Sequence, residues 1–348
     1  GGTTFQPMLT FDDIGWAPMS DLETSNTRAA GGDAAAAAEL ARRHLMGAGV
    51  AHHPQSAARL LAAADAKGDG EASALIAVLI GVSANAPDVW NQAFGYLQRA
   101  AELGLAGARG QLAVLSADRA LAGEARSASS PPDLWKRLRQ SIDLDQWLSA
   151  PPGTDLSASP TIKTYGAFLA PHVCDWLVER VQGRMARAQI YDQQTGQGRD
   201  NPARTNSAFE FKIVDADLVL LLARARLAVA TGFATRALED TNVLHYRPGQ
   251  EFHRHFDFLD PNGPGMAQEI ANNGQRIASF LIYLNDGFEG GETEFPLLKI
   301  RNKGAKGDAL FFISVDASGA PDRRTLHAGL PPASGEKWLL SQWVRARA

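Results

Sequence analysis

The stretch "LHYRPGQEFHRHFDFL", residues 244–259, carries three histidines, one aspartate and four aromatic residues within sixteen positions. His253, His255 and Asp257 recur there at every second position. Alternate residues of a β-strand project from the same face of a sheet. The stretch therefore predicts a strand with a metal-binding face, but its periodicity does not say which of the two histidines is the ligand.

Two ligands that lie two residues apart on one strand can reach the same ion. Two histidines and one carboxylate form the facial triad of non-haem Fe(II) oxygenases. An isolated His-x-Asp pair also occurs as a surface hydrogen bond, so a third ligand is needed. His327, in "LHAGLPPASGEKWLLSQW" (326–343), is the candidate for that position. Lys337 follows it, and a buried lysine needs an anionic partner, which a dicarboxylic acid such as 2-oxoglutarate would supply.

Six motifs occur in order within residues 160–346: "FLAPHVCDWLVERV", "ARTNSAFEF", "LHYRPGQEFHRHFDF", "QRIASFLIYLNDGFEGGETEFP", "KGDALFF" and "LHAGLPPASGEKWLLSQWVR". This region resembles the prolyl 4-hydroxylase-like family of Fe(II)/2-oxoglutarate dioxygenases. The family pattern Y-x-x-G-Q-x-[YF]-x-x-H-x-D fits residues 246–257 without a gap and selects His255. His253 is then expected near the mouth of the site or on the surface.

The resemblance implies a role for each of a set of side chains. His255, Asp257 and His327 are the implied iron ligands, and Lys337 is the implied partner of the distal carboxylate of 2-oxoglutarate. Thr293 is expected to shape a turn. Tyr246 and Tyr283 are implied at the co-substrate, with core packing as the alternative, and Ser279 shares strand parity with Tyr283. Arg204, Thr205 and Ser207 are implied at the substrate, with a solvated Arg204 in an ordinary exposed hairpin as the alternative. Trp343 shares strand parity with Lys337 and is expected to line the pocket wall at the substrate, with a core role as the alternative.

The implied reaction is hydroxylation, with the prolyl residue of a protein as the leading substrate. It uses Fe(II), O2 and 2-oxoglutarate, releases succinate and CO2, and has ascorbate as a candidate reductant. Halogenation is not implied, because Asp257 is present. A repeat-based scaffold or sensor with a weakly active barrel is one alternative, and a hydroxylase of free amino acids or other small molecules is another. Residues 191–211 resemble the mobile loop that closes over peptide, and 260–275 are a second candidate lid.

The first third of the chain repeats with a period of 36 residues. Small and apolar residues recur at this offset, as in Gly32, Gly68 and Gly104, Ala36, Ala72 and Ala108, and Leu40, Ile76 and Leu112. Such a period predicts an α-solenoid of paired helices. The segment "AAELARRHLMGAGVAHHPQSAARLLAAADAKGDGEA" resembles a Sel-one type of tetratricopeptide-like repeat. The array either holds a partner protein, such as the substrate, or only packs on the second domain.

The bulk composition excludes several classes of protein. Hydrophobic residues make up 45% and charged residues 21%, as in ordinary globular proteins. The net charge of −4 gives no footprint for nucleic acid, and no apolar run is long enough for a membrane span. The single cysteine, Cys174, excludes an internal disulfide framework and favours a cytoplasmic location.

The predicted fold is α+β, an N-terminal α-solenoid followed by a double-stranded β-helix, or jelly roll, with supporting helices. Strands are expected at 241–247, 251–258, 276–284, 308–314 and 337–345, and helices at 170–188 and 215–232. The predicted organisation is an N-terminal extension (1–30), Sel-one-like repeats (31–122), a linker with one short helix near 132–149 (123–159) and the dioxygenase domain (160–348).

Overall fold

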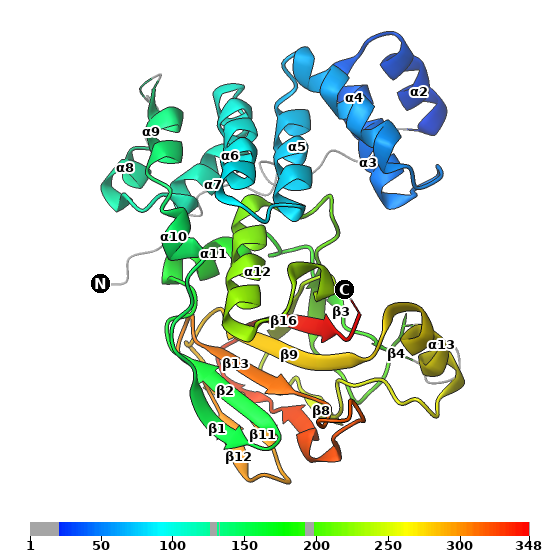
Figure 1. Ribbon diagram of the computed structural model, residues 1–348, viewed down its shortest axis with the longest axis vertical. Coiled ribbons are helices and arrows are strands. Elements are labelled where there is room, and N and C mark those ends of the chain that lie inside the picture. Colours follow the sequence, from blue (N-terminus) through cyan, green and yellow to red (C-terminus); the bar gives the residue numbers. More distant parts are fainter. Residues whose placement is uncertain (1–20, 126–130, 132, 192–197, 348) are drawn as a thin grey trace. The chain divides into compact units, whose positions relative to one another are not determined.

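The computed structural model describes residues 21–125, 131, 133–191 and 198–347. The chain divides into two compact units, which are considered separately. The first unit holds the described residues up to Trp147 together with Lys212–Leu222, and the second holds Leu148–Phe211 and the residues from Ala223 onward. Figure 1 shows that the first unit is built of helices and that the strands belong to the second.

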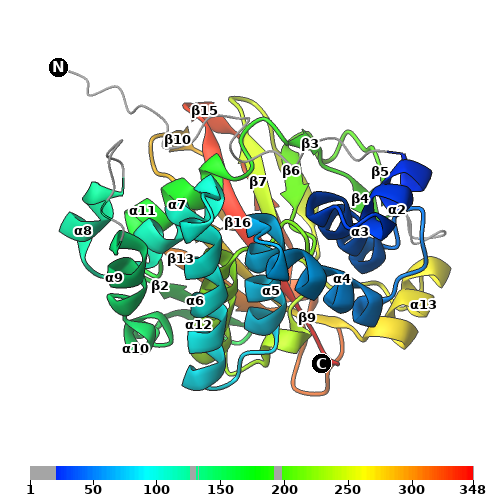
Figure 2. The same cartoon turned by 90° about the horizontal axis from the view of Figure 1, so that it is seen from above.

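The first unit is an array of short helices in which successive helices pack on one another, as Figure 2 shows for α3 to α7. This confirms the predicted helical solenoid. None of the described helices is long and apolar enough to cross a membrane. The helices are α2 (Leu22–Ala30), α3 (Ala34–Met46), α4 (Pro54–Ala66), α5 (Gly70–Val82), α6 (Pro87–Glu102), α7 (Ala106–Leu115), α8 (Arg119–Glu124), α9 (Leu134–Gln140) and α10 (Leu144–Trp147).

The 36-residue period has a direct structural cause. Helices α3, α5 and α7 begin at residues 34, 70 and 106, each two residues after a glycine. Gly32, Gly68 and Gly104 have φ angles of 90°, 84° and 95°, a left-handed conformation that glycine adopts without steric cost. The side chains of Asp33 and Asp69 then cap α3 and α5 by accepting hydrogen bonds from backbone N–H groups. The repeated glycines therefore mark the turns that start each helix pair.

The second unit consists mainly of two antiparallel sheets with an apolar core between them, which confirms the predicted double-stranded β-helix. The larger sheet has the order β1 (Thr154–Ala158), β2 (Thr161–Tyr165), β13 (Ala309–Ile313), β9 (Arg276–Tyr283), β16 (Lys337–Arg345), β7 (Asn242–Tyr246), β6 (Ser207–Glu210) and β3 (Ala186–Arg187). The smaller sheet has the order β12 (Ile300–Asn302), β11 (Thr293–Phe295), β14 (His327–Gly329) and β8 (Phe252–His255). Two separate strand pairs complete the second unit: β4 (Ile190–Tyr191) with β5 (Gly198–Arg199), and β10 (Glu289–Gly290) with β15 (Pro332–Ser334).

The remaining helices test two predictions. Helix α12 (Leu218–Thr231) confirms the helix predicted at 215–232. The helix predicted at 170–188 is too long, because α11 (Pro171–Glu179) ends early and Gly183 takes a left-handed φ of 81°. Residues 186–187 then pair with β6 as strand β3. The other helical segments are α13 (Pro264–Asn273) and the 3-10 turns η1 (Thr235–Ala237) and η2 (Arg323–Thr325).

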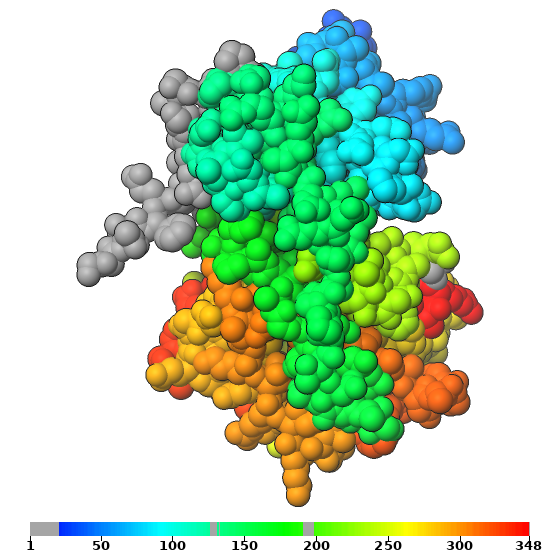
Figure 3. Space-filling view, turned by 60° about the vertical axis from the view of Figure 1, so that its left-hand side comes forward, coloured from blue at the N-terminus to red at the C-terminus, as the bar shows by residue number. Residues whose placement is uncertain are grey.

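Two predicted connecting segments contain more structure than their composition indicates. Residues 22–30 of the predicted extension form α2, and the single helix expected near 132–149 is two helices, α9 and α10. Strand β1 lies inside the predicted linker and pairs with β2. Its residues are almost all exposed, and Figure 3 shows this green segment at the surface. An exposed edge strand lacks apolar alternation, so its sequence looks like a loop.

Candidate active site

Strands β8 and β14 bring the three predicted metal ligands together. His255 and His327 are register partners on these adjacent antiparallel strands, and Asp257 follows β8 by two residues. One donor atom from each residue lies within 4.8 Å of the others. The Nε2 atoms of His255 and His327 lie 3.5 Å and 3.6 Å from the two carboxylate oxygens of Asp257. Within the described part of the chain, this is the only cluster of three such side chains.

Backbone carbonyls fix the orientation of both imidazole rings. The Nδ1 atom of His255 donates to the carbonyl of His253 at 2.7 Å, and that of His327 donates to Thr325 at 3.0 Å. Because a carbonyl can only accept, each Nδ1 carries a proton and each Nε2 lone pair is left for an ion. Phe252 also stacks on the ring of His255 at 3.5 Å. Both donors are therefore held in place by the protein itself.

The electrostatics of the cluster suit metal binding. Burial, together with the charge of His255, lowers the pKa of His327 to about 4, so its imidazole is neutral at pH 7. Burial alone would raise the pKa of Asp257, but His327, His255 and a hydrogen bond from Ser279 hold it well below its usual range. The Ser279 hydroxyl donates to Asp257 at 2.5 Å. An ionised carboxylate and a neutral imidazole are the forms that bind metals.

Lys337 lies on β16 with its amine fully buried. It is the register partner of Tyr246 on β7, and its Nζ donates to the carbonyl of Gly291 at 2.7 Å. Burial lowers the pKa of Lys337 to about 7, against a weak opposing effect of Glu292. Among the residues that the structure describes, the amine of Lys337 donates to a backbone carbonyl and forms no ion pair with a carboxylate. The site thus has a buried amine whose cationic form lacks an anionic partner.

Two tyrosine rings flank Lys337, at 5.0 Å for Tyr246 and 5.7 Å for Tyr283. In the described part of the chain the Tyr246 hydroxyl has no hydrogen-bond partner, and burial raises its pKa to about 12, so it remains a donor. The Tyr283 hydroxyl is already engaged, because it donates to the carbonyl of Asn302 at 2.9 Å. Tyr246 therefore has the freer hydroxyl of the two.

Thr293 is better placed than its sequence context indicates. It was expected to shape a turn, but it begins strand β11, is 2% exposed and lies 3.2 Å from the Tyr283 hydroxyl. The preceding glycines made the segment look like a turn. The alternation of buried Thr293 and Phe295 around half-buried Glu294 is the signal that identifies a strand with an inward threonine.

Ser279 and Trp343 are register partners on β9 and β16. The structure places the Ser279 hydroxyl against the carboxylate of Asp257, so its observed partner is a predicted metal ligand. Trp343 shares its strand face with Lys337 and is half-buried. Its Nε1 atom is buried and has no hydrogen-bond partner among the described residues.

The predicted substrate contacts from the loop lie beside β8. Arg204 is 7% exposed, stacks on Phe252 at 4.5 Å and donates to the carbonyl of Gln189 at 2.9 Å, so it is a buried residue and not a solvated loop contact. The backbone N–H of Thr205 donates to Glu251 at 2.9 Å. Ser207 is half-buried in β6, and residues 192–197 of this predicted loop lie outside the described residues. His253, as expected, is exposed.

Residues 241–345 match the family model of the 2OG-Fe(II) oxygenase superfamily. Over 207 residues the chain is 32% identical to prolyl 4-hydroxylase 1 of Arabidopsis thaliana, a match that covers 56% of this chain and 71% of the relative. The chain belongs to the prolyl 4-hydroxylase family. Matches to the Arabidopsis proteins named probable prolyl 4-hydroxylases 7, 6 and 3 cover between 66% and 72% of the relative.

Two solved structures are similar to parts of this prolyl 4-hydroxylase family member. A viral collagen prolyl hydroxylase from Paramecium Bursaria Chlorella virus-1, in complex with 2OG, is 27% identical and covers 53% of this chain and 96% of that chain, with a TM-score of 0.40. A Sel1 repeat protein from Oxalobacter formigenes is 27% identical and covers 34% of this chain and 97% of that chain, with a TM-score of 0.28. All the predicted metal and co-substrate residues lie inside the segment matched by the family model, whereas Arg204 and Ser207 lie outside it.

Proposed function

We propose that this protein is an Fe(II)- and 2-oxoglutarate-dependent dioxygenase that hydroxylates a prolyl residue of a protein or peptide. The observation that carries the proposal is the combination of the clustered His255, Asp257 and His327 with the buried amine of Lys337. That amine donates to a backbone carbonyl and has no carboxylate partner among the described residues. The cluster of two histidines and one aspartate suits a metal ion, and the amine of Lys337 suits an anion. The names of the Arabidopsis relatives support proline as the hydroxylated residue.

The donor set fits Fe(II). Two imidazole nitrogens and one carboxylate are the ligands of non-haem Fe(II) oxygenases, and they leave adjacent coordination positions open. His255, Asp257 and His327 would hold the ion. Bound Fe(II) supplies the redox chemistry that couples the oxidation of 2-oxoglutarate to hydroxylation of the substrate. The protein contributes fixed donor orientations, through the Nδ1 hydrogen bonds of the two histidines and the Ser279 hydroxyl on Asp257.

The buried polar groups of Lys337 and Tyr246 also suit 2-oxoglutarate. Lys337 would pair with its distal carboxylate, and this pairing supplies the anion that the buried amine lacks. The hydroxyl of Tyr246, which has no hydrogen-bond partner among the described residues, would donate a further hydrogen bond to the co-substrate. Because both groups are buried, their interactions with a carboxylate are stronger than the same contacts in water.

Each turnover would consume one 2-oxoglutarate and one O2. It would yield succinate, CO2 and one hydroxylated residue, with ascorbate as the reductant that restores Fe(II) after uncoupled cycles. Trp343 would form part of the wall along the substrate. The helical repeats would hold the substrate protein. The cytoplasmic location favoured by the single cysteine also stays a prediction.

The test is succinate release by the full chain with Fe(II), 2-oxoglutarate and proline-containing peptides, with mass spectrometry to locate a gained oxygen. The expected result is peptide-stimulated succinate and oxygen on proline. Stimulation by free amino acids instead would assign a small-molecule substrate. No binding of 2-oxoglutarate by the anaerobic Fe(II) protein would refute the proposal.

A further inference from the structure

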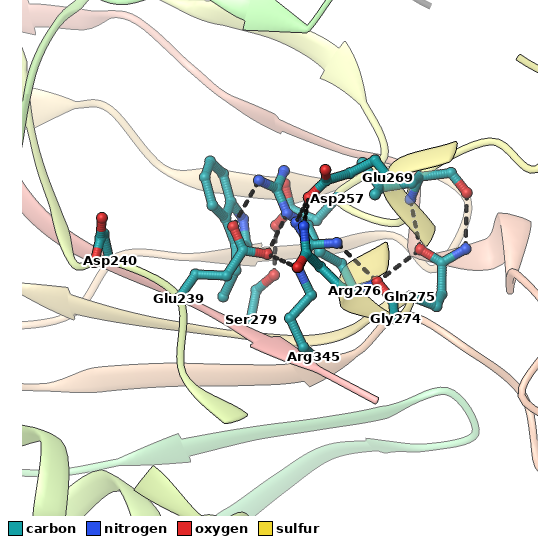
Figure 4. Close-up of polar contacts among 12 residues, drawn as sticks. Glu239, Asp240, Asp257, Glu269, Gly274, Gln275, Arg276, Ser279 and Arg345 are labelled. Atoms are coloured by element: carbon teal, nitrogen blue, oxygen red, sulfur yellow. Dashed lines mark hydrogen bonds and ion pairs between the residues drawn. The ribbon is translucent and has the colours of Figure 1, made fainter. Parts of the chain in front are cut away.

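Four charged side chains form a network, called here the charge network, beside the Ser279–Asp257 contact (Figure 4). Arg276 binds the two carboxylate oxygens of Glu239 at 2.7 Å and 2.8 Å. Arg345 binds the same carboxylate at 2.5 Å and reaches Glu269 at 2.7 Å. Charges therefore alternate in the order Arg276, Glu239, Arg345 and Glu269.

Burial distinguishes the charge network from ordinary surface ion pairs. The side chains of Arg276 and Arg345 are 5% and 9% exposed, and that of Glu239 is 17% exposed. Arg276 and Arg345 are also register partners on β9 and β16, where like charges destabilise a sheet. Glu239 binds both guanidinium groups. Removal of one member would leave a buried charge without its partner, so the members hold one another in place.

At one end, the charge network contacts Trp343. The guanidinium of Arg276 stacks over the ring of Trp343 at 3.7 Å from its centroid. The backbone N–H of Glu239 donates to the carbonyl of Trp343 at 3.0 Å. Across the strand from Trp343, Ser279 donates to Asp257. The stacked guanidinium therefore fixes the plane of an indole that stands beside the predicted metal site.

At its other end, the charge network binds helix α13, which follows the segment that contains Asp257. No residue of α13 is buried, so packing alone does not fix its position. Arg345 binds Glu269 on this helix and the carbonyl of Gly274 just after it, at 2.7 Å each. The side chain of Gln275 binds both the N–H and the carbonyl of Leu259, at 2.7 Å and 2.8 Å. Polar contacts thus attach this segment to the ends of β9 and β16.

We propose that Glu239, Arg276 and Arg345 are positioning residues that couple helix α13 to the indole of Trp343, so that the two sides of the substrate path are held as one unit. The inference rests on the proposed function, because it takes Trp343 and α13 as walls of the path followed by a peptide. The Trp343 Nε1 atom is buried, so the indole would contact a bound peptide through its ring. The Arg276 guanidinium stacked on that ring holds its plane.

The test uses two mild substitutions and a control in the full chain. Arg276→Lys keeps the charge but removes the planar group that stacks on Trp343. Glu269→Gln cuts the attachment of α13 at its most exposed member, which is 33% exposed. Arg301→Gln is the control. Arg301 forms a 2.7 Å ion pair with Glu294, but its side chain is 64% exposed and does not belong to the charge network. Unfolding temperatures close to that of the unsubstituted protein would show that the variants fold.

For each variant we measure four quantities: the KM for peptide, kcat, the KM for 2-oxoglutarate and the succinate released per hydroxylated peptide. We expect both test variants to raise peptide KM on the order of tenfold and to release excess succinate, while the KM for 2-oxoglutarate changes by less than about twofold. The double variant should be less impaired than the product of the two single effects, because both substitutions break the same coupling. Arg301→Gln should match the unsubstituted protein.

Direct binding of a labelled proline-containing peptide separates the two proposals. If the unsubstituted protein releases no succinate, the proposed function fails, and the effects of the variants on peptide affinity still decide on the coupling. Unchanged peptide affinity in Arg276→Lys and Glu269→Gln would overturn the inference. Multiplicative effects in the double variant would overturn the coupling of α13 to Trp343.

Discussion

Replacement of Lys337 by Met should stabilise the protein in the absence of ligands while removing its response to 2-oxoglutarate. Burial lowers the pKa of this amine from 10.5 to about 7. That change corresponds to about 5 kcal/mol against the buried cation, because each tenfold change in proton affinity is about 1.4 kcal/mol. Met fills a similar volume without a charge but loses the hydrogen bond to Gly291, at a cost of about 1 kcal/mol. The free energy of unfolding of Lys337→Met should therefore exceed that of the unsubstituted protein by about 4 kcal/mol at pH 6.

The sign of the pH dependence follows from linkage. Below pH 7 the amine is protonated in both the folded and the unfolded chain, so the folded state of the unsubstituted protein carries the whole cost of the buried charge. Between pH 7 and 10.5 the folded amine is neutral while the unfolded chain still binds the proton. The free energy of unfolding therefore rises with pH in the unsubstituted protein relative to Lys337→Met. The difference in free energy of unfolding between Lys337→Met and the unsubstituted protein should shrink to about 1 kcal/mol at pH 9.

The assay is urea unfolding at pH 6 and pH 9 without metal or 2-oxoglutarate. Lys303→Met is the control, since Lys303 also donates to a backbone carbonyl, that of Phe288, but is exposed. It should give no gain in stability. Added 2-oxoglutarate with a redox-inert divalent ion should stabilise the unsubstituted protein but not Lys337→Met. A variant that is no more stable at pH 6, or a gap that persists at pH 9, would refute this account of Lys337.

Three further outcomes are expected. His255→Ala should abolish iron-dependent turnover, whereas Lys337→Ala should chiefly raise the 2-oxoglutarate concentration required; equal loss of bound metal from both would contradict the assigned roles. Affinity for 2-oxoglutarate, measured by titration, should fall about tenfold per pH unit above pH 7 as Lys337 loses its proton, and a flat profile to pH 9 would argue against that pairing. Gly307→Ala should cost about 3 kcal/mol or more in urea unfolding, because its φ is 91° and a Cβ there would collide with the carbonyl oxygen of Leu169. Gly68→Ala, with a similar φ but ordinary space around it, should cost about 1 kcal/mol, so equal losses would show that the collision is relieved.

The sequence was sufficient wherever a local pattern has a local cause. The recurrence of Gly32, Gly68 and Gly104 every 36 residues predicted paired helices, and its local cause is the left-handed turn that each glycine takes before a helix. The strand around His255 followed from its alternation, although β8 ends at His255 and the predicted strand extended to residue 258. Alternation could not separate His255 from His253, since both share one face, and the choice came from the family pattern. The structure brings His255 together with Asp257 and His327 but leaves His253 exposed.

Features that depend on distant partners were not visible in the sequence. Arg276 finds Glu239 across 37 positions, and Arg345 finds Glu269 across 76. Charged residues at strand ends look like solvated side chains until their partners are known. The helix expected to reach residue 188 failed for a local reason, because one left-handed glycine, Gly183, outweighed the helix propensity of the residues around it.

The glycine and aspartate that precede both α3 and α5 also make this part of the array divisible into equal parts. Asp33 accepts a hydrogen bond from the N–H of Ala36, and Asp69 accepts one from Ala72, the residue 36 positions later. Excision of residues 34–69 would join Asp33 directly to Gly70 and recreate the same cap on the next helix. Duplication of that segment would lengthen the array by one pair in the same way. Gene duplication or deletion in steps of this length can therefore change the reach of the helical unit without designing a new junction.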